Sequence, residues 1–327
     1  MGSVLFPGMR AAALLLALAA AACAPLQREV APPQQPAGCS VTLAADLPAT
    51  IEQNALVIEA TAGAQPLRLL VDTGASGDGA LSGEAVSRLG LAPVQGAARV
   101  TTIAGLVAQS QRVHVPALRL GTLPPVEVAM AVMPPEAAGV LATRADGLLG
   151  AAILSRYDVE IDPDAGRLRL HEVQGCFGGL VPFSEPYQTL PLRLGPFEQI
   201  YVLMRIDGAE LLALVDTGYN GGVLILPRGA ERIGIDGDGA GDLARGVGRD
   251  FTGQAVPVRV RRVGSITLGN FVARNAPVAV LVPQAGRAPV VVQDDALLGS
   301  GFLLRRRVWI SYATGRLHVA DRISAPR

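Results

Sequence analysis

Two stretches of this sequence predict its fold: Leu70-Val71-Asp72-Thr73-Gly74-Ala75-Ser76 and Leu214-Val215-Asp216-Thr217-Gly218-Tyr219-Asn220. Each is an apolar run that ends in Asp-Thr-Gly, and one lies in each half of the 327-residue chain. A single copy is typical of any strand that ends in a turn. Two copies in matching surroundings predict a duplicated fold that brings two carboxylates face to face, an arrangement that activates water.

The surroundings of the two stretches repeat as well. Landmarks keep one order in both halves, and their offset drifts only from 144 to 149 residues. The matched pairs are Asp72 with Asp216, Leu89-Gly90-Leu91 with Ile233-Gly234-Ile235, Leu120-Gly121 with Leu268-Gly269, and Leu148-Leu149-Gly150 with Leu297-Leu298-Gly299. Internal repeats behave in this way when only their loops change length. The sequence therefore predicts two homologous lobes.

Composition is that of a globular chain with room for two cores. Half of the residues are hydrophobic, and aromatic residues make up only 4%, so the cores must consist mainly of aliphatic side chains. Lys plus Arg and Asp plus Glu number 28 each, which gives a net charge of zero. This balance argues against nucleic acid as a partner.

The first residues have the character of a targeting segment. Arg10 precedes an apolar run too short to span a bilayer, so residues 1–22 are interpreted as a signal peptide. Ala20-Ala21-Ala22-Cys23 resembles a bacterial lipobox, in which Cys23 would carry the lipid; ordinary cleavage after Ala22 is the alternative. Residues 23–40 would then form a Pro- and Gln-rich tether. By this analogy we expect an outer-membrane-anchored lipoprotein in the periplasm.

Short alternating or wholly apolar runs between Gly, Pro and Asp predict an all-β chain with few short helices. An example is the strand expected at Val126 to Val132. Helical patterns are confined to pieces such as Gly83 to Leu89 and Arg228 to Ile233, and to a turn after each Leu-Leu-Gly. The expected divisions are an N-terminal lobe at 41–171, a linker at 172–185, a C-terminal lobe at 186–321 and a tail at 322–327.

These residues carry a resemblance to the aspartic protease clan, which includes pepsin-like enzymes and retropepsins. Both halves of the mature chain share Asp-Thr-Gly on an apolar strand, a Gly-centred hairpin some thirty residues later, a Leu-Leu-Gly run and a closing hairpin. The first lobe has the retroviral form Asp-Thr-Gly-Ala, and Tyr219 follows the motif in the second. The chain thus resembles bacterial periplasmic retropepsin-like proteases with two β-barrel lobes, a cleft between them and one chain per active site.

The resemblance implies an aspartic endopeptidase that needs no cofactor and acts on polypeptides. Asp72 and Asp216 would share one proton and activate a water molecule, because two carboxylates in contact cannot both ionise cheaply. Thr73 and Thr217 would cross-link the two loops, and Gly74 and Gly218 would let backbone N–H groups approach the carboxylates. The loops lack additional hydroxyl donors, so we expect raised carboxyl pKa values and a mildly acidic to neutral pH optimum.

The hairpins are expected to cover an extended substrate. Their tips are placed at Ile103-Ala104-Gly105 and Phe251-Thr252-Gly253, and ordinary hairpins without a lid role are the alternative. Leu148-Leu149-Gly150 and its counterpart are interpreted as core. Asp146 and Asp295, just before these runs, are interpreted as turn or cap residues.

Cys39 and Cys176 could form a disulfide in an oxidising periplasm, or could be two unrelated thiols. The three histidines are scattered and follow no common offset, so no metal site is indicated. We expect a monomer. A non-catalytic peptide-binding module and a structural envelope lipoprotein on the same fold are the competing hypotheses.

Overall fold

The computed structural model describes residues 34–101, 107–134, 145–176, 179–235, 241–249, 255–282 and 294–323. Strands dominate these described residues, which contain only four short α-helices. The expected all-β class with few short helices is therefore confirmed. Within the same residues, no helix is long and apolar enough to cross a membrane.

The strands fall into two series, one in each half. The first series is β1 (Ser40–Glu52), β2 (Ala55–Ala62), β3 (Gln65–Val71), β4 (Gly79–Leu81), β5 (Pro93–Thr101), β6 (Val107–Arg119), β7 (Val126–Val132), β8 (Gly147–Leu149), β9 (Asp158–Asp162) and β10 (Arg167–Gln174). The second is β11 (Tyr187–Pro191), β12 (Arg193–Leu194), β13 (Ile200–Ile206), β14 (Ala209–Asp216), β15 (Val223–Ile225), β16 (Asp242–Arg249), β17 (Ala255–Leu268), β18 (Phe271–Leu281), β19 (Ala296–Gly299), β20 (Val308–Ser311) and β21 (Arg316–Ala320). The described helices are α1 (Gly83–Leu89), α2 (Ala151–Leu154), α3 (Pro227–Arg232), α4 (Ser300–Leu303) and the 3-10 helix η2 (Pro196–Glu198).

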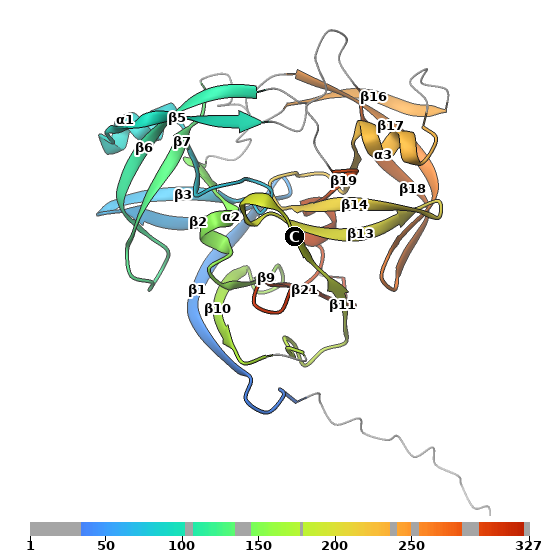
Figure 1. The fold of residues 1–327 in the computed structure, drawn as a ribbon, viewed down its shortest axis with the longest axis horizontal. Coiled ribbons are helices and arrows are strands. Elements are labelled where there is room, and N and C mark those ends of the chain that lie inside the picture. The colour runs from blue at the N-terminus through green and yellow to red at the C-terminus, as the bar shows by residue number, and fades with distance from the viewer. Residues whose placement is uncertain are drawn as a thin grey trace, which may run out of the picture. The chain divides into compact units, whose positions relative to one another are not determined.

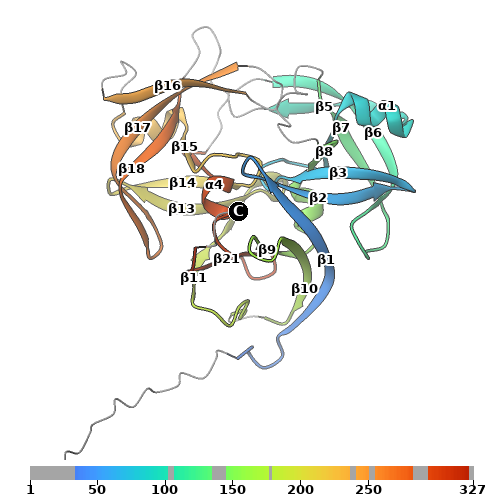
Figure 2. The ribbon, with the colours of Figure 1, turned by 180° about the vertical axis from the view of Figure 1, so that it is seen from behind.

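Each half closes a barrel of six strands in the described part of the chain. In the first half, the order β2-β3-β8-β4-β7-β6 closes through pairing of β2 with β6. In the second half, β13-β14-β19-β15-β18-β17 closes through β13 and β17. Figure 1 shows the two barrels as separate lobes, and Figure 2 shows them from behind. The same strand order in both halves confirms the two homologous lobes that the repeat predicts.

Local sequence explains where the helices begin and end. The Ser82 side chain accepts a hydrogen bond from the Ala85 N–H and caps α1, and Gly90 ends this helix in the left-handed conformation (φ 62°). Pro227 opens α3, where its missing N–H costs nothing. Each helix lies between a barrel strand and the following hairpin, as the sequence pattern predicts.

A further sheet joins the two lobes. It runs β11-β21-β20-β9-β10-β1 and contains strands from both halves, because β20 pairs antiparallel with β9 (Trp309 opposite Glu160). The long strand β1 pairs first with β10 and then with β2, so it connects this sheet to the first barrel. The closing hairpins expected in each lobe, β9–β10 and β20–β21, therefore pair across the lobes (Figure 1). The expected lobe and linker boundaries stay a prediction.

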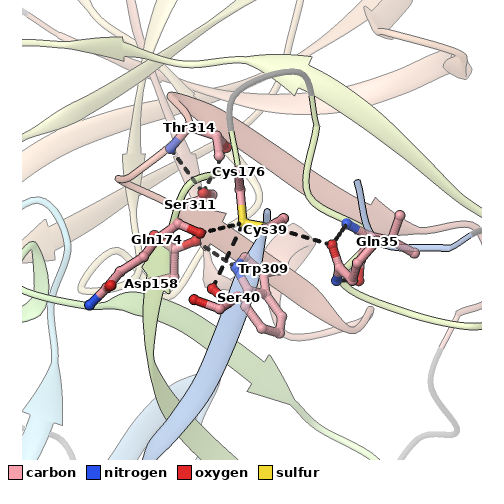
Figure 3. The surroundings of a disulfide bond; sticks show 10 residues. Gln35, Cys39, Ser40, Asp158, Gln174, Cys176, Trp309, Ser311 and Thr314 are labelled. Atoms are coloured by element: carbon pink, nitrogen blue, oxygen red, sulfur yellow. Dashed lines mark hydrogen bonds between the residues drawn. A yellow bond between two sulfur atoms is a disulfide. The ribbon is translucent and has the colours of Figure 1, made fainter. Parts of the chain in front are cut away.

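A disulfide closes one end of this interlobe sheet. Cys39, just before β1, bonds to Cys176, just after β10, with a Cα–Cα distance of 4.3 Å. Figure 3 shows the pair near Trp309 of β20. Cys176, Trp309, Leu180, Phe183 and Ala320 form an apolar cluster drawn from both halves of the chain. Of the two possibilities for these cysteines, a disulfide or two unrelated thiols, the structure contains the disulfide.

Candidate active site

Two equivalent loops carry the predicted carboxylates. Asp72 directly follows β3, which runs parallel to β8, and the Asp72 N–H donates to the Leu149 carbonyl at 3.0 Å. Asp216 ends β14, which runs parallel to β19 opposite Gly299. The residues before each aspartate are buried on both faces of their sheet, as parallel strands with apolar runs usually are. The barrels therefore hold both loops on rigid strands.

Backbone N–H groups hold each carboxylate. Oδ1 of Asp72 accepts from the N–H groups of Gly74 and Ala75, both at 2.9 Å. In the other lobe, Oδ1 of Asp216 accepts from Gly218 at 2.9 Å and from Tyr219 at 3.0 Å. These bonds fix the orientation of the two carboxyl groups before any substrate binds.

The two glycines of the motifs leave room for the carboxyl group of the opposite lobe. A Cβ atom at Gly74 would lie 2.6 Å from Cγ of Asp216, and one at Gly218 would overlap the Asp72 carboxyl group. Any larger residue would therefore separate the loops. The structure brings the two predicted carboxyl groups together, and the charge of Asp72 acts on Asp216.

The two threonines cross-link the loops as the sequence predicts. The Thr73 N–H donates to Oγ1 of Thr217 at 3.0 Å, and the Thr217 N–H donates to Oγ1 of Thr73 at 3.1 Å. Each hydroxyl also donates to a carbonyl of the other lobe, Thr73 to Val215 at 2.6 Å and Thr217 to Val71 at 2.7 Å. Both threonines are fully buried, and these bonds replace the hydrogen bonds to water that their N–H and hydroxyl groups lose on burial.

The electrostatics of the pair favour a shared proton. Burial raises the pKa of Asp72, and burial together with the Asp72 charge raises the pKa of Asp216 to about 8. The backbone N–H groups act in the opposite direction without cancelling the shift. One carboxyl group therefore keeps its proton at neutral pH while the other can ionise, which is the state that general acid–base chemistry needs.

Tyr219 packs into its own lobe. A Cβ atom at Gly221 would lie 2.9 Å from Cε1 of Tyr219, and one at Gly299 would overlap its ring, so both glycines leave space for the tyrosine. Burial and the Asp216 charge raise the pKa of the Tyr219 hydroxyl to about 12. This side chain is therefore neutral wherever the carboxyl pair can share a proton.

Two amide side chains donate hydrogen bonds to the catalytic loop of the opposite lobe. Gln199 Nε2 donates to the Gly74 carbonyl at 2.5 Å, and Asn54 Nδ2 donates to the Asn220 carbonyl at 3.2 Å. Neither residue was predicted from the sequence. The repeat gives no signal for them, because the 144-residue offset relates Asn54 to Glu198 and Gln199 to Ala55. Ser300, which donates to the Thr217 carbonyl at 2.7 Å, was missed as well.

Asp146 and Asp295 connect the strands and helices that lie behind the catalytic loops. Asp146 accepts from the Arg68 N–H and from Arg88 of α1, at 2.9 and 2.6 Å. Asp295 accepts from the Leu212 N–H and Arg232 of α3, at 2.9 and 2.7 Å. Each aspartate thus ties a barrel strand to a helix.

The remaining predicted site residues lie outside the described residues. The strands of both expected hairpins are present, since β5 pairs with β6 and β16 with β17. Their tips, Ile103-Ala104-Gly105 and Phe251-Thr252-Gly253, are not described, and neither is Cys23. A lid role for the hairpins and lipidation of Cys23 stay predictions.

The two homologous barrels and the paired Asp-Thr-Gly loops together define the two-lobed aspartic protease class. A family model described as aspartyl protease matches residues 58–153 and 202–302. The two matches include Asp72 and Asp216 and together cover more than half of the chain. The chain belongs to the aspartyl protease family, and the predicted resemblance is confirmed. Among curated proteins, none matches this chain.

Proposed function

We propose that this protein is an aspartic endopeptidase that cleaves peptide bonds with water activated between Asp72 and Asp216. The observation that supports this proposal is the pair of adjacent carboxyl groups, each held by two backbone N–H groups, on loops that two buried threonines cross-link. A binding module or a structural protein would have no need for this arrangement, which costs stability because it buries two acidic groups side by side.

The chemistry follows from one proton shared by two carboxyl groups. The ionised carboxylate takes a proton from water while the water oxygen bonds to the substrate carbonyl carbon. The protonated carboxyl group donates its proton to the carbonyl oxygen, which gives a neutral tetrahedral diol. The C–N bond then breaks as the amine receives a proton from the first carboxyl group, and a diol hydroxyl returns a proton to the second. The products are a carboxylic acid and an amine, and the pair regains its starting state.

We further propose that the protein works in the bacterial cell envelope as a monomer tethered by Cys23. The apolar segment before Cys23 supports this location, and so does the Cys39–Cys176 bond, because disulfides persist in oxidising compartments. Metabolic labelling with a radioactive fatty acid, compared between the wild type and Cys23→Ser, tests the anchor. If the wild type does not incorporate the label, the lipid anchor is contradicted.

The activity is tested by incubating the purified protein with a peptide library, with and without pepstatin, and identifying the fragments by mass spectrometry. Asp72→Asn and Asp216→Asn should each abolish cleavage, because amides cannot exchange the proton. Asp164→Asn, which makes the same chemical change in the exposed turn between β9 and β10, should cleave like the wild type. A folded protein that cleaves no peptide between pH 3 and 9 would favour the binding or structural alternative.

A further inference from the structure

A side chain outside the Asp-Thr-Gly motifs reaches the first catalytic loop from the second half of the chain. Gln199 lies between η2 and β13, and its Nε2 donates to the Gly74 carbonyl at 2.5 Å. The Gln199 carbonyl accepts from the Gly195 N–H at 2.8 Å, which fixes the backbone from which this side chain extends. The contact therefore crosses from one lobe to the other at a defined position.

One peptide group connects Gln199 to a catalytic carboxyl group. The Gly74 carbonyl and the Ala75 N–H belong to the same peptide group, and this N–H donates to Oδ1 of Asp72 at 2.9 Å. A donor on the oxygen of a peptide group polarises the group and makes its N–H a stronger donor. Because a hydrogen bond to an ionised carboxyl group favours the ionised form, this chain of hydrogen bonds stabilises the Asp72 carboxylate.

The second lobe supports Asp216 through a different peptide group. The Ser300 hydroxyl donates to the Thr217 carbonyl at 2.7 Å, and the Gly218 N–H of that same peptide group donates to Oδ1 of Asp216 at 2.9 Å. Ser300 belongs to the lobe that it supports. Of these two donors, Gln199 is the one that crosses between the lobes.

The internal repeat does not duplicate either donor. Gln199 corresponds to Ala55 at the 144-residue offset, and Ser300 corresponds to Ala151 at the 149-residue offset. An alanine side chain has no group that can donate a hydrogen bond. The two lobes therefore support their carboxyl groups with different residues, although both motifs read Asp-Thr-Gly.

We propose that Gln199 is a positioning residue of the catalytic pair, which acts through the Gly74–Ala75 peptide group to stabilise Asp72 as the ionised general base. This inference rests on the proposed endopeptidase function. Burial raises the pKa of Asp72, and the Ala75 N–H opposes that rise. Asp216 is the titratable group that faces Asp72, and its raised pKa of about 8 makes it the carboxyl group that keeps the proton.

The variant Gln199→Ala installs the residue that the repeat has at position 55. The pair loses activity at low pH, when Asp72 also takes up a proton, and loss of the Gln199 donor should raise the pH of this transition. We expect the acid limb of kcat/KM to move upward by roughly half a pH unit, the effect of weakening a charged hydrogen bond by about a quarter. Gln199→Leu, which keeps the bulk of the side chain, should give the same shift.

The matched control is Asn54→Ala. Asn54 Nδ2 also donates across the lobes, to the Asn220 carbonyl at 3.2 Å. The N–H of that peptide group belongs to Gly221, and among the described residues it donates to neither carboxyl group. This variant removes an interlobe hydrogen bond of the same kind but leaves the path to the carboxylate intact. It should keep the acid limb of the wild type, whatever its rate.

A second measurement does not depend on catalysis. NMR spectra of protein with isotope-labelled aspartate side chains report the titration of the Asp72 carboxyl carbon, whose signal is the one absent from Asp72→Asn. The titration midpoint should rise by the same roughly half a pH unit in Gln199→Ala and stay unchanged in Asn54→Ala.

The outcomes separate this inference from the proposed function. Equal midpoints in the wild type and both Gln199 variants, or an equal shift in Asn54→Ala, overturn the role of Gln199 and leave the endopeptidase standing. A folded wild type that cleaves no peptide, with a midpoint that still shifts in Gln199→Ala, overturns the endopeptidase and leaves Gln199 as the residue that positions Asp72.

Discussion

At the scale of single residues, an aspartate becomes reactive in this site because of its environment. Asp164 has the same side chain as Asp216 but lies exposed in a turn. Asp216 is 9% exposed and faces a second acid, so its ionisation is opposed both by lost hydration and by the Asp72 charge. The reactive state is thus a consequence of where the repeat places these aspartates.

The raised pKa of Asp216 predicts the pH dependence of catalysis. Cleavage needs one proton on the pair. Because the pKa of Asp216 is about 8, this proton stays bound through neutral pH and is lost as the pH rises through 8. We expect kcat/KM to be highest at mildly acidic to neutral pH and to fall about tenfold per pH unit above 8. Initial rates between pH 3 and 10 measure this profile, and a maximum below about pH 3 would contradict it.

The residue scale was also where sequence reasoning succeeded best. Asp72, Thr73 and Gly74 and their second-lobe counterparts could be predicted because a constant offset makes a repeat visible without any structure. Gln199 could not be predicted as a brace for Gly74, since their contact spans 125 residues and exists only once the lobes lie together.

At the scale of elements, turn residues predicted the closing hairpins, but nothing predicted that the two hairpins pair with each other. Asp162-Pro163-Asp164-Ala165-Gly166 is turn chemistry, and it does join β9 to β10. That β9 then pairs with β20 depends on Val159 and Ile310, which lie far apart in the sequence and are ordinary apolar strand residues. Nothing in either residue type specifies such a partner, so the interlobe sheet emerged only from the structure.

The interlobe sheet buries an ionic cluster around Glu160 of β9. Arg307 donates to Glu160 at 2.6 Å from the second half of the chain, and Arg169 of β10 donates at 2.9 Å. His171 lies 2.9 Å from the second carboxylate oxygen and stacks on Trp309. Burial opposes ionisation of Glu160, yet the hydrogen bonds from His171 and Arg307 and the two arginine charges lower its pKa to about 2.

Glu160→Gln should therefore destabilise the protein at neutral pH by about 2–3 kcal/mol, somewhat below the usual cost of breaking a buried ion pair because both arginines reach solvent. The contribution is complete above the unfolded-state pKa near 4.5 and is lost as the pH falls toward 2, so the difference should shrink at pH 3. Urea unfolding at pH 7 and pH 3 measures it. Glu210→Gln, which breaks an exposed pair with Arg205, is the control and should cost under about 0.5 kcal/mol. Equal effects of both variants would contradict a special role for Glu160.

At the scale of the whole molecule, the active site exists only where two lobes meet, so anything that holds the lobes together supports catalysis indirectly. The shared sheet does this through β9 and β20, and the Cys39–Cys176 bond closes a loop with a sequence separation of 137. Cys176 also packs in the cluster that contains Trp309 and Ala320 of the second half. The disulfide itself connects the ends of β1 and β10 in the first half, and it supports the joint between the lobes through this packing.

Loss of this disulfide should lower stability and leave cleavage at 25 °C within about twofold of the wild type. In the chain-entropy model a loop of this size contributes about 4–5 kcal/mol, because the bond restricts the unfolded chain. Thermal unfolding of the wild type and of Cys39→Ser/Cys176→Ser, each with and without reductant, measures the effect. Reductant should lower the melting temperature of the wild type toward that of the double variant, which should not respond. If reductant moves both proteins equally, or neither, the bond does not hold the joint, and the shared sheet alone must keep the two carboxylates in contact.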